Sequence, residues 1–566
     1  MSLMNKLYRL LLIVCCFVLL GAVNTASFKV TGIKGDLLLN VKSRLGELYQ
    51  DKPIAIEPLE NVRLQVNKAM YPFGFFNAQI TFGHTDAGNR LLIQIVPGPQ
   101  MLITSLRVRI TGEGAENSEI KQALHDMPIA AGQPLNNKLY EEAKDNLISA
   151  AEHQGFLHAS FSKAEMLIDR TRYVSQITLD FNTGPQYYFG QIRFDPTYIS
   201  PELLHRYVPF TAGQPYSTDQ VLALNTNLSA SGYFNSVVVK PQINDKSQAP
   251  IFIHLQPKKR ISYSLGVGYG TDTGPRGRAG IDVIPVNRAG HKFNAIVQGS
   301  LKENALLAQY LIPGRNPVTD NYSINGSFSN LNYSSGYSNS LLLSIAQQHA
   351  ETNYQRVISL NGLDERYNYT GQPKTTKLLL FPKAALTWRK VSDQLFSPSG
   401  YNLSVYGLAG NKFLLSQVNF AQAVADMKAA ITVDPVRTRF FLHLTQGVTQ
   451  INNVNDLPLS LAMLMGGADN LKAYSYNSIG PGKLMSFVSM EIQKETFEKW
   501  YFIGFVDTGD VYKPAAKAFQ YDAGIGLMWV SPVGPIKIGV AQAVDNHLQR
   551  IQGRNPKLVI NMGPDL

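Results

Sequence analysis

The chain has 566 residues, of which 16% are charged and 10% aromatic, with 45 glycines and a formal net charge of +11. This length exceeds that of one ordinary domain, so several folded units are expected. Lys and Arg are spread along the sequence and form no block interleaved with aromatic residues, which argues against a nucleic-acid-binding protein. The charge is compatible with simple solubility or with attraction to anionic lipid and lipopolysaccharide.

The first 26 residues have the pattern of a secretory signal peptide. Lys6 and Arg9 flank the start of an unbroken apolar run, Leu10–Leu20, and small residues follow as far as Ala26. The run is shorter than the roughly 20 apolar residues that a membrane-spanning helix needs. We therefore predict cleavage near residues 22–27, with an uncleaved anchor as the alternative.

Motifs of catalytic or metal-binding chemistry are missing from the sequence. The two cysteines, Cys15 and Cys16, lie inside the predicted signal segment, so the mature chain is expected to have no disulfide and no thiolate metal site. There is no Gly-x-Ser-x-Gly elbow, no His-Glu-x-x-His motif, no Walker loop and no Cys/His cluster. These features predict a protein that is not an enzyme and that holds no metal and no cofactor. A hydrolase whose catalytic groups meet only in space is the remaining alternative.

The first half of the sequence contains an internal repeat. The tetrapeptide Ala-Gly-Gln-Pro occurs at residues 131–134 and again at 212–215, and a helical stretch follows each copy. A glycine followed by an aromatic residue occurs at 74–75, 155–156 and 232–233, at spacings of 81 and 77 residues. Two tetrapeptides with matching flanks indicate a repeated structural module.

The middle repeat shows the expected internal order of elements. Its hydrophobic pattern predicts strands at 103–110, 161–168 and 174–181 and helices at 117–125 and 139–153. We expect an α+β unit in which an antiparallel sheet carries both helices on one face.

The repeat spacing divides this region into three modules, at residues 27–98, 99–184 and 185–258. The first module is the least regular of the three. The aromatic side chains after the three glycines are expected to fill the module cores: Phe75, Phe156 and Tyr233.

From residue 259 to 566 the pattern becomes that of an all-β transmembrane barrel. Between Ile261 and Gly270, large apolar or aromatic residues alternate with Ser and Gly, as in a strand with one face toward lipid. A closed barrel satisfies every backbone amide in hydrocarbon. The region accommodates about sixteen antiparallel strands of ~10 residues, with fourteen or eighteen also compatible. Similar segments recur between turn residues: 291–301, 322–328, 378–388, 401–408, 437–444, 487–493, 500–506 and 523–530.

Several segments of the chain resemble the BamA/TamA superfamily, and TamA most closely. The modules resemble POTRA domains, and residues 457–481 resemble the long extracellular loop that folds back into the barrel lumen in this family. The resemblance covers nearly the whole mature chain. Further matching segments are 396–400, 489–491, 505–512, 531–535 and 563–566.

The resemblance implies that the tip of this loop contacts acidic residues on the strands that follow. The tip is formed by Leu471, Lys472, Ala473 and Tyr474, and its acidic partners are Glu491 and Asp507. The family has Arg in place of Lys472 and Gly in place of Ala473. Arg offers a planar fork and Gly adopts positive φ at low cost, so we expect a less rigid contact here.

The junction between the first and last barrel strands is expected to be weak. The last strand, 557–563, is short and meets a proline, which has no amide to donate. An opened edge would offer unpaired backbone groups to which a substrate strand could add; a sealed barrel is the alternative. The expected seam residues are Ile261, Tyr263, Leu265, Leu558, Ile560, Met562 and Pro564.

By this resemblance, the chain is an outer-membrane assembly or translocation factor with its POTRA modules in the periplasm. It would insert or secrete β-rich proteins such as autotransporters, and phospholipid transfer to the outer membrane remains compatible as a further task. The implied partners are an inner-membrane-anchored periplasmic protein like TamB, client outer-membrane proteins, and lipids or lipopolysaccharide. A two-partner-type secretion channel and a passive diffusion pore are the alternatives.

Overall fold

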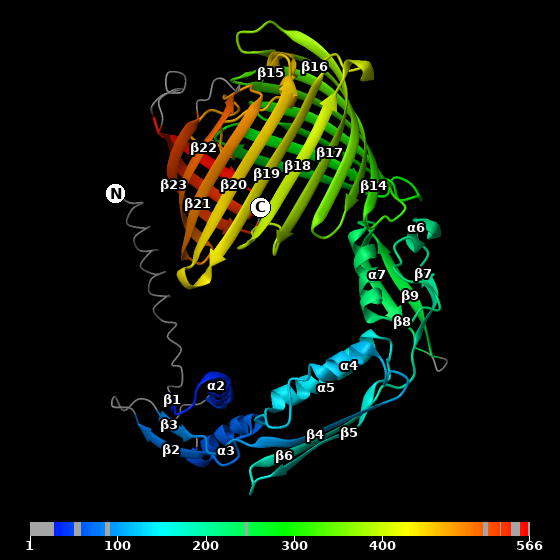
Figure 1. Ribbon diagram of the computed structural model, residues 1–566, viewed down its shortest axis with the longest axis vertical. Helices are drawn as coiled ribbons and strands as arrows, with labels where there is room; N and C mark the ends of the chain where they lie inside the picture. Colours follow the sequence, from blue (N-terminus) through cyan, green and yellow to red (C-terminus); the bar gives the residue numbers. More distant parts are fainter. Residues whose placement is uncertain are drawn as a thin grey trace, which may run out of the picture. The chain divides into compact units, whose positions relative to one another are not determined.

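A computed structural model shows three small modules followed by a sixteen-stranded antiparallel sheet (Figure 1). This confirms the fold class expected from the sequence. No helix within the described part of the chain is both long and apolar enough to cross a membrane. The predicted signal segment lies outside the described residues, which are 28–49, 58–84, 91–243, 247–512, 519–532, 534–544, 555–563 and 566.

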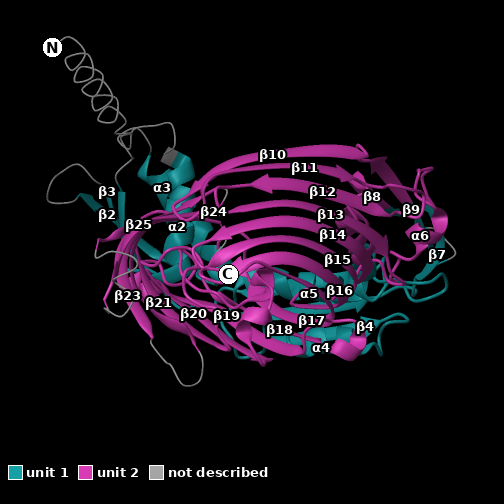
Figure 2. Ribbon diagram, turned by 90° about the horizontal axis from the view of Figure 1, so that it is seen from above, with its two compact units in different colours: residues 1–193, 210–222, 240–252 teal, residues 194–209, 223–239, 253–566 magenta. Residues whose placement is uncertain are grey.

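The chain divides into two compact units (Figure 2). The first contains residues 1–193, 210–222 and 240–252, and the second contains 194–209, 223–239 and 253–566. The barrel therefore belongs to the second unit, and the division runs through the third module.

The first module has a three-stranded sheet in the order β1-β3-β2. β1 runs parallel to β3, and β2 runs antiparallel to it. Its elements are β1 (Phe28–Thr31), α2 (Gly35–Tyr49), α3 (Leu59–Met70), the short helix η2 (Tyr71–Phe73), β2 (Gln79–His84) and β3 (Leu91–Val96).

The second module repeats this plan, with strand order β4-β6-β5. β4 pairs parallel with β6, so the expectation of a purely antiparallel sheet is wrong. The two helices form a long crossover after β4, and such a connection allows parallel pairing with the far strand of the β5–β6 hairpin. The elements are β4 (Leu102–Thr111), α4 (Ser118–His125), α5 (Asn137–His153), β5 (Ser160–Asp169) and β6 (Val174–Asn182).

The third module has the strand order β7-β9-β8. Its elements are β7 (Tyr188–Phe194), α6 (Pro201–His205), α7 (Thr218–Ala230), β8 (Phe234–Pro241) and β9 (Gln248–Pro257).

The repeated tetrapeptide borders the first strand of its module. The Gly132 amide donates to the Ile103 carbonyl at 2.7 Å, and the Gly213 amide donates to the Phe189 carbonyl at the same distance. In each copy the proline of the tetrapeptide forms an isolated antiparallel bridge to that strand. The repeat therefore marks equivalent edge pairings in the second and third modules.

The aromatic residues after the three glycines lie at the module cores, as expected. Phe156 and Tyr233 are buried, and Phe75 is half-buried against the first core. Each glycine before them has a positive φ, between 79° and 87°, which ends the preceding helical segment at little steric cost.

The barrel strands follow one another in sequence around the wall, each pairing with the next (Figure 2). Ten of the sixteen lie at segments that the sequence located individually. The strands are β10 (Ile261–Gly270), β11 (Gly274–Val283), β12 (Lys292–Gly299), β13 (Glu303–Pro313), β14 (Asp320–Tyr333), β15 (Gly336–Ala350), β16 (Tyr354–Tyr369), β17 (Thr375–Val391), β18 (Gly400–Gly410), β19 (Phe420–Val433), β20 (Thr438–Ile451), β21 (Leu484–Phe497), β22 (Trp500–Tyr512), β23 (Gln520–Ser531), β24 (Gly534–Ala543) and β25 (Lys557–Met562).

The two ends of the barrel are defined here by the chain path. The linker end is the one at which β10 begins after β9, and the far end carries the β10–β11 turn. Because the strands alternate in direction, the segment between β20 and β21 starts from the far end.

Candidate functional site

The segment between β20 and β21, residues 452–483, occupies the lumen of the barrel. Leu457 packs with inward residues of β16, β17 and β18, such as Leu363 and Phe381. Leu471 and Tyr474 pack with Phe487 of β21 and with other inward side chains. We call residues 452–483 the lumen loop. Its burial agrees with the position that the sequence resemblance implies.

Local backbone geometry makes the tip of the lumen loop compact. Met465 and Ile479 exchange two backbone hydrogen bonds of 2.9 Å, which bring the two arms together. Gly466 has a φ of 114°, and a Cβ there would lie 2.2 Å from the Ser475 carbonyl oxygen. The Asn470 side chain accepts the Gly466 amide at 2.7 Å. Glycine is therefore required at this turn.

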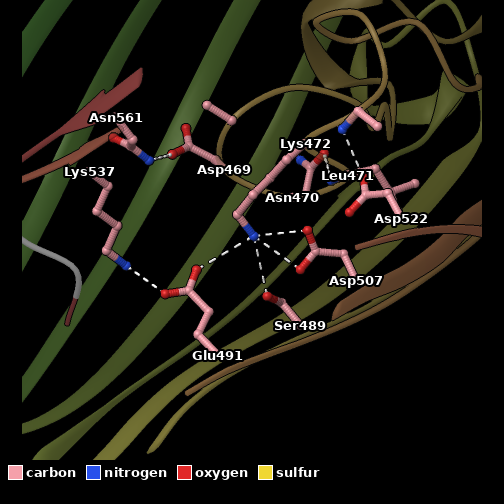
Figure 3. Close-up of polar contacts among 12 residues, drawn as sticks. Asp469, Asn470, Leu471, Lys472, Ser489, Glu491, Asp507, Asp522, Lys537 and Asn561 are labelled. Atoms are coloured by element: carbon pink, nitrogen blue, oxygen red, sulfur yellow. Dashed lines mark hydrogen bonds and ion pairs between the residues drawn. The ribbon is translucent and has the colours of Figure 1, made fainter. Parts of the chain in front are cut away.

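Lys472 reaches from the tip into a buried polar site (Figure 3). Its Nζ lies 3.0 and 2.9 Å from the two carboxylate oxygens of Asp507 and 3.5 Å from Oε1 of Glu491. The ammonium also lies 4.5 Å from the centre of the Phe505 ring, a cation–π contact. Asp507 is 0% exposed and Lys472 only 8%. The structure thus brings Lys472 together with both acidic residues named from the sequence.

The electrostatic environment keeps Lys472 charged. Burial by itself would lower the pKa of this ammonium. The adjacent carboxylates of Asp507 and Glu491 outweigh burial and raise the pKa above the ordinary lysine value. The loop tip therefore carries a stable positive charge into the lumen.

Two further ionisable residues complete the site and were missed by the sequence analysis. Asp522 on β23 accepts the Ala473 amide at 2.8 Å, and Lys537 on β24 lies 2.8 Å from Glu491 (Figure 3). Asp522 stands directly opposite Asp507 in the β22–β23 ladder. A charged residue at an inward position of a barrel strand was the available signal.

Ala473 differs from the expectation drawn from the family pattern. Positive φ values occur at several residues of the lumen loop, but Ala473 is not among them. The alanine in place of the family glycine therefore brings no backbone strain at this position.

The lumen loop also reaches both sides of the β10–β25 junction. Asp272, in the β10–β11 turn, accepts a hydrogen bond from the Ala468 amide of the loop. It also forms an ion pair with Lys557 of β25, in which Oδ1 lies 2.8 Å from Nζ. Lys557 donates in addition to the Tyr474 carbonyl at 2.8 Å. Asp469 of the loop bonds Asn561 at 2.9 Å (Figure 3).

No strand ladder joins β10 to β25 within the residues that the structure describes. The backbone contact at this junction is made with a side chain: the Ile560 amide donates to Thr271 Oγ1 at 3.2 Å. β25 has six residues and β10 has ten. The two strands therefore meet mainly through side chains at the far end.

The seam residues named from the sequence lie on outward faces but are not brought together in a register. On β10, Leu265 is 88% exposed; Ile261 and Tyr263 are also exposed. On β25, Leu558, Ile560 and Met562 stand opposite outward residues of β24, and Pro564 lies outside the described residues.

A cavity of about 660 Å³ lies at this junction. Residues of β10, β11, β25 and the lumen loop line it, among them Gly266, Arg276, Asp469 and Asn561. Among the described residues, no group of three or more His, Cys, Asp or Glu side chains could hold a metal ion.

Comparison with known families identifies this architecture. Residues 294–557 match the family described as Omp85 superfamily domain. Residues 27–97 match the POTRA domain described as TamA domain 1, and residues 187–258 match a POTRA family described as surface antigen variable number repeat. The chain belongs to the Omp85 superfamily. Its TamA-type first POTRA domain confirms the resemblance to TamA.

Solved structures support the Omp85 fold. BamA from Haemophilus ducreyi lacking POTRA domains 1–3 is 16% identical, with a TM-score of 0.68 over 82% of this chain and 98% of that one. CdiB from Acinetobacter baumannii is 12% identical over 94% of this chain and all of that one, with a TM-score of 0.48. CdiB from Escherichia coli is also 12% identical, over 89% and 96%, with a TM-score of 0.47. The BamA likeness shows the fold alone, and the two CdiB scores are too low to bear on function.

Proposed function

We propose that this Omp85 chain is an outer-membrane assembly or translocation factor, with its POTRA domains in the periplasm. It inserts or secretes β-rich proteins such as autotransporters through a lateral seam between β10 and β25. The observation that carries the proposal is the missing ladder at this one junction in the described chain, since every other pair of neighbouring strands is laddered. The proposed role is not enzymatic.

The exposed edge of β10 suits the addition of a substrate strand. Leu265 and Val267 are 88% and 95% exposed, whereas the outward Val297 of β12, which has a laddered strand on each side, is 57% exposed. A strand edge without a partner presents a row of backbone donors and acceptors, and an extended peptide can pair with that row. The cavity at the junction offers space for such a segment.

The closed junction would cost little to open. A ladder along the six residues of β25 would supply roughly 3 to 9 kcal/mol, at about 0.5 to 1.5 kcal/mol for each hydrogen bond. In its place stand a few contacts, chiefly Lys557 with Asp272 and Ile560 with Thr271. We propose that the lumen loop holds the β10–β25 junction closed, because it contacts both Asp272 and β25.

The buried anchor of the loop supports this role. Lys472 holds the tip against the wall formed by β21–β24, while Asp469 and the Tyr474 carbonyl contact β25. A displaced tip would release these contacts together. We therefore propose a positioning role for three residues that hold the lumen loop in place: Lys472, Glu491 and Asp507.

The two alternatives fit the molecule less well. A passive pore needs an open lumen, whereas the lumen loop packs into the barrel interior with buried residues along its length. Two-partner secretion channels usually carry two POTRA modules, whereas three sheets precede the barrel here.

The proposed partners follow from the module type. A TamA-type first POTRA domain suggests docking of an inner-membrane-anchored periplasmic protein like TamB. Client outer-membrane proteins would use the seam, and lipids or lipopolysaccharide would surround the barrel. Phospholipid transfer would be a second use of the same seam.

The function is tested by comparing cells with and without the chain. We expect the assembled fraction of autotransporters and other β-rich outer-membrane proteins to fall when the gene is deleted and to recover on complementation. A change confined to the phospholipid balance would replace protein by lipid as the cargo. Unchanged protein and lipid levels would refute the proposal.

A further inference from the structure

The turn between β18 and β19 displays three consecutive large apolar side chains at the far end of the barrel. Phe413, Leu414 and Leu415 are 96%, 61% and 77% exposed. A contiguous apolar patch on an exposed surface usually marks an interaction site, whereas single exposed apolar residues need no explanation. We call these three residues the apolar turn.

A dense set of hydrogen bonds fixes the backbone of the apolar turn, whose side chains are exposed. The Asn411 side chain accepts the Phe413 amide at 2.8 Å, and the Asn411 carbonyl accepts the Leu414 amide at 2.9 Å. The Lys412 amide donates to the Asn419 side chain at 2.8 Å. Leu415 has a φ of 63°, a conformation that residues with side chains rarely adopt. The display of the three side chains is therefore built into the turn.

The turn is also fixed in height along the barrel wall. The Gln417 amide donates to the Leu378 carbonyl and the Leu378 amide donates to the Gln417 side chain, both at 3.0 Å. β17 continues past this point as far as Thr375, and the β16–β17 turn at 370–374 stands farther out. The apolar turn therefore lies below the outermost edge of the barrel.

At this height the turn continues the outward apolar wall. Leu379 is fully buried toward the lumen, so the alternation of the strand points Leu378 outward, where it is half exposed. Lys412 is the one charged residue in 411–419. Exposed apolar residues that follow directly from a lipid-facing wall, next to a single lysine, have the composition of a bilayer interface.

We infer that the apolar turn inserts among the acyl chains of the outer leaflet of the membrane, with Lys412 at the level of the lipid phosphates. The inference rests on the proposed function only in placing the barrel in the outer membrane. A protein partner is less favoured, because the turn directly continues the outer apolar surface at Leu378.

Fluorescence quenching by brominated lipid tests this insertion. The three native tryptophans, Trp388, Trp500 and Trp529, are replaced by Phe in the full chain, and Phe413→Trp supplies a single probe. The protein is reconstituted into vesicles of dioleoyl or dibrominated phosphatidylcholine after heat-modifiable migration has shown a folded barrel. We expect blue-shifted emission and strong quenching in the brominated vesicles.

Two matched probes make the result decisive. Gln372→Trp, in the β16–β17 turn, is expected to be quenched by acrylamide and not by brominated lipid. A variant that keeps only Trp529, which is outward on β23, is expected to be quenched by the lipid. If Trp529 is quenched and the probe at position 413 behaves like that at 372, the inference is wrong while the membrane location stands. If Trp529 is not quenched either, the proposed membrane location fails as well. A blue shift at position 413 that needs an added protein would also overturn the inference.

Discussion

Replacing Lys472 by Met removes the charge from the centre of the lumen loop while keeping most of the apolar stem. Asp507 then loses both of its hydrogen bonds from Nζ, at 3.0 and 2.9 Å, and has 0% exposure through which water could compensate. Glu491 keeps Lys537 at 2.8 Å. The penalty therefore falls mainly on Asp507.

The size of the effect follows from two opposing contributions. Leaving one buried charge unpaired costs about 3 to 5 kcal/mol. Expulsion of the tip would relieve that cost by admitting water, but it would also expose buried Leu471 and Tyr474, at about 1.5 to 3 kcal/mol for each large apolar side chain. Because the two contributions are similar, we predict a mixed population of inserted and expelled loops in a barrel that stays folded.

Labelling from outside the cell measures this population. The predicted mature chain has no cysteine, so Ala473→Cys gives a single reactive site at the tip. We predict slow labelling by an impermeant maleimide with Lys472 present and at least about tenfold faster labelling with Lys472→Met, as a shift of 1.4 kcal/mol or more would produce. Asp507→Asn added to Lys472→Met should restore protection, since it removes the unpaired charge. Equal labelling rates with Lys and Met, or no recovery in the double variant, would refute this reasoning.

Further predictions concern the same site, the junction and the third module. Lys472→Arg should keep the tip protected or protect it further, because a guanidinium can bond both carboxylates; faster labelling than in the wild type would contradict this. The pKa of Lys472 is raised above the ordinary value of 10.5. The stability that the charged Lys472 gives to the inserted tip is therefore fully present below pH 10.5 and is lost as pH rises through the folded-state pKa. Tip protection should therefore be constant from neutral pH to about pH 9, and a loss within this range would count against the charged contact. Asp272→Asn removes the partner of Lys557 and should weaken the junction by roughly 1 to 3 kcal/mol. The β25 amides should then exchange their hydrogens faster than in the wild type. Unchanged hydrogen exchange would contradict this prediction. Tyr233→Phe loses a 2.6 Å hydrogen bond to the Gly290 carbonyl. We expect faster hydrogen exchange in the 284–291 turn and a free energy of unfolding lower by about 0.5 to 1.5 kcal/mol. Hydrogen exchange identical to the wild type would show that the bond contributes nothing.

Much of the barrel could be predicted because strand periodicity is a local signal. The alternation at 261–270 located β10 to the residue, and the glycine-rich loop sequence located the tip that carries Lys472. Strands such as β19, with its alanine-rich outward face, lack the contrast between a face of large apolar residues and a face of small residues. They were therefore not located individually. The parallel pairing of β4 with β6 was also missed. The residue pattern of a strand gives its buried face but does not give its direction relative to the strand with which it pairs.

The rest of the site depends on contacts between distant segments. Asp522 and Lys537 are inward ionisable residues on β23 and β24, but nothing local shows that the loop tip meets their wall. The contact between Asp272 and Lys557 joins residues at opposite ends of the barrel sequence. Periodicity gives the face of each residue, whereas the partner across the lumen requires the folded chain.

Covalent closure of the junction between β10 and β25 is the most direct measurement of whether substrates pass there. Thr271→Cys with Ile560→Cys, joined by a short bis-maleimide that adds one thiol at each end, would hold the two sides together where they already touch. Ala295→Cys with Ala308→Cys, facing residues of the laddered β12–β13 pair, is the matched control. We predict that the first crosslink abolishes client insertion in reconstituted vesicles and that the control crosslink leaves it intact. Full insertion with the first pair linked would contradict a lateral route.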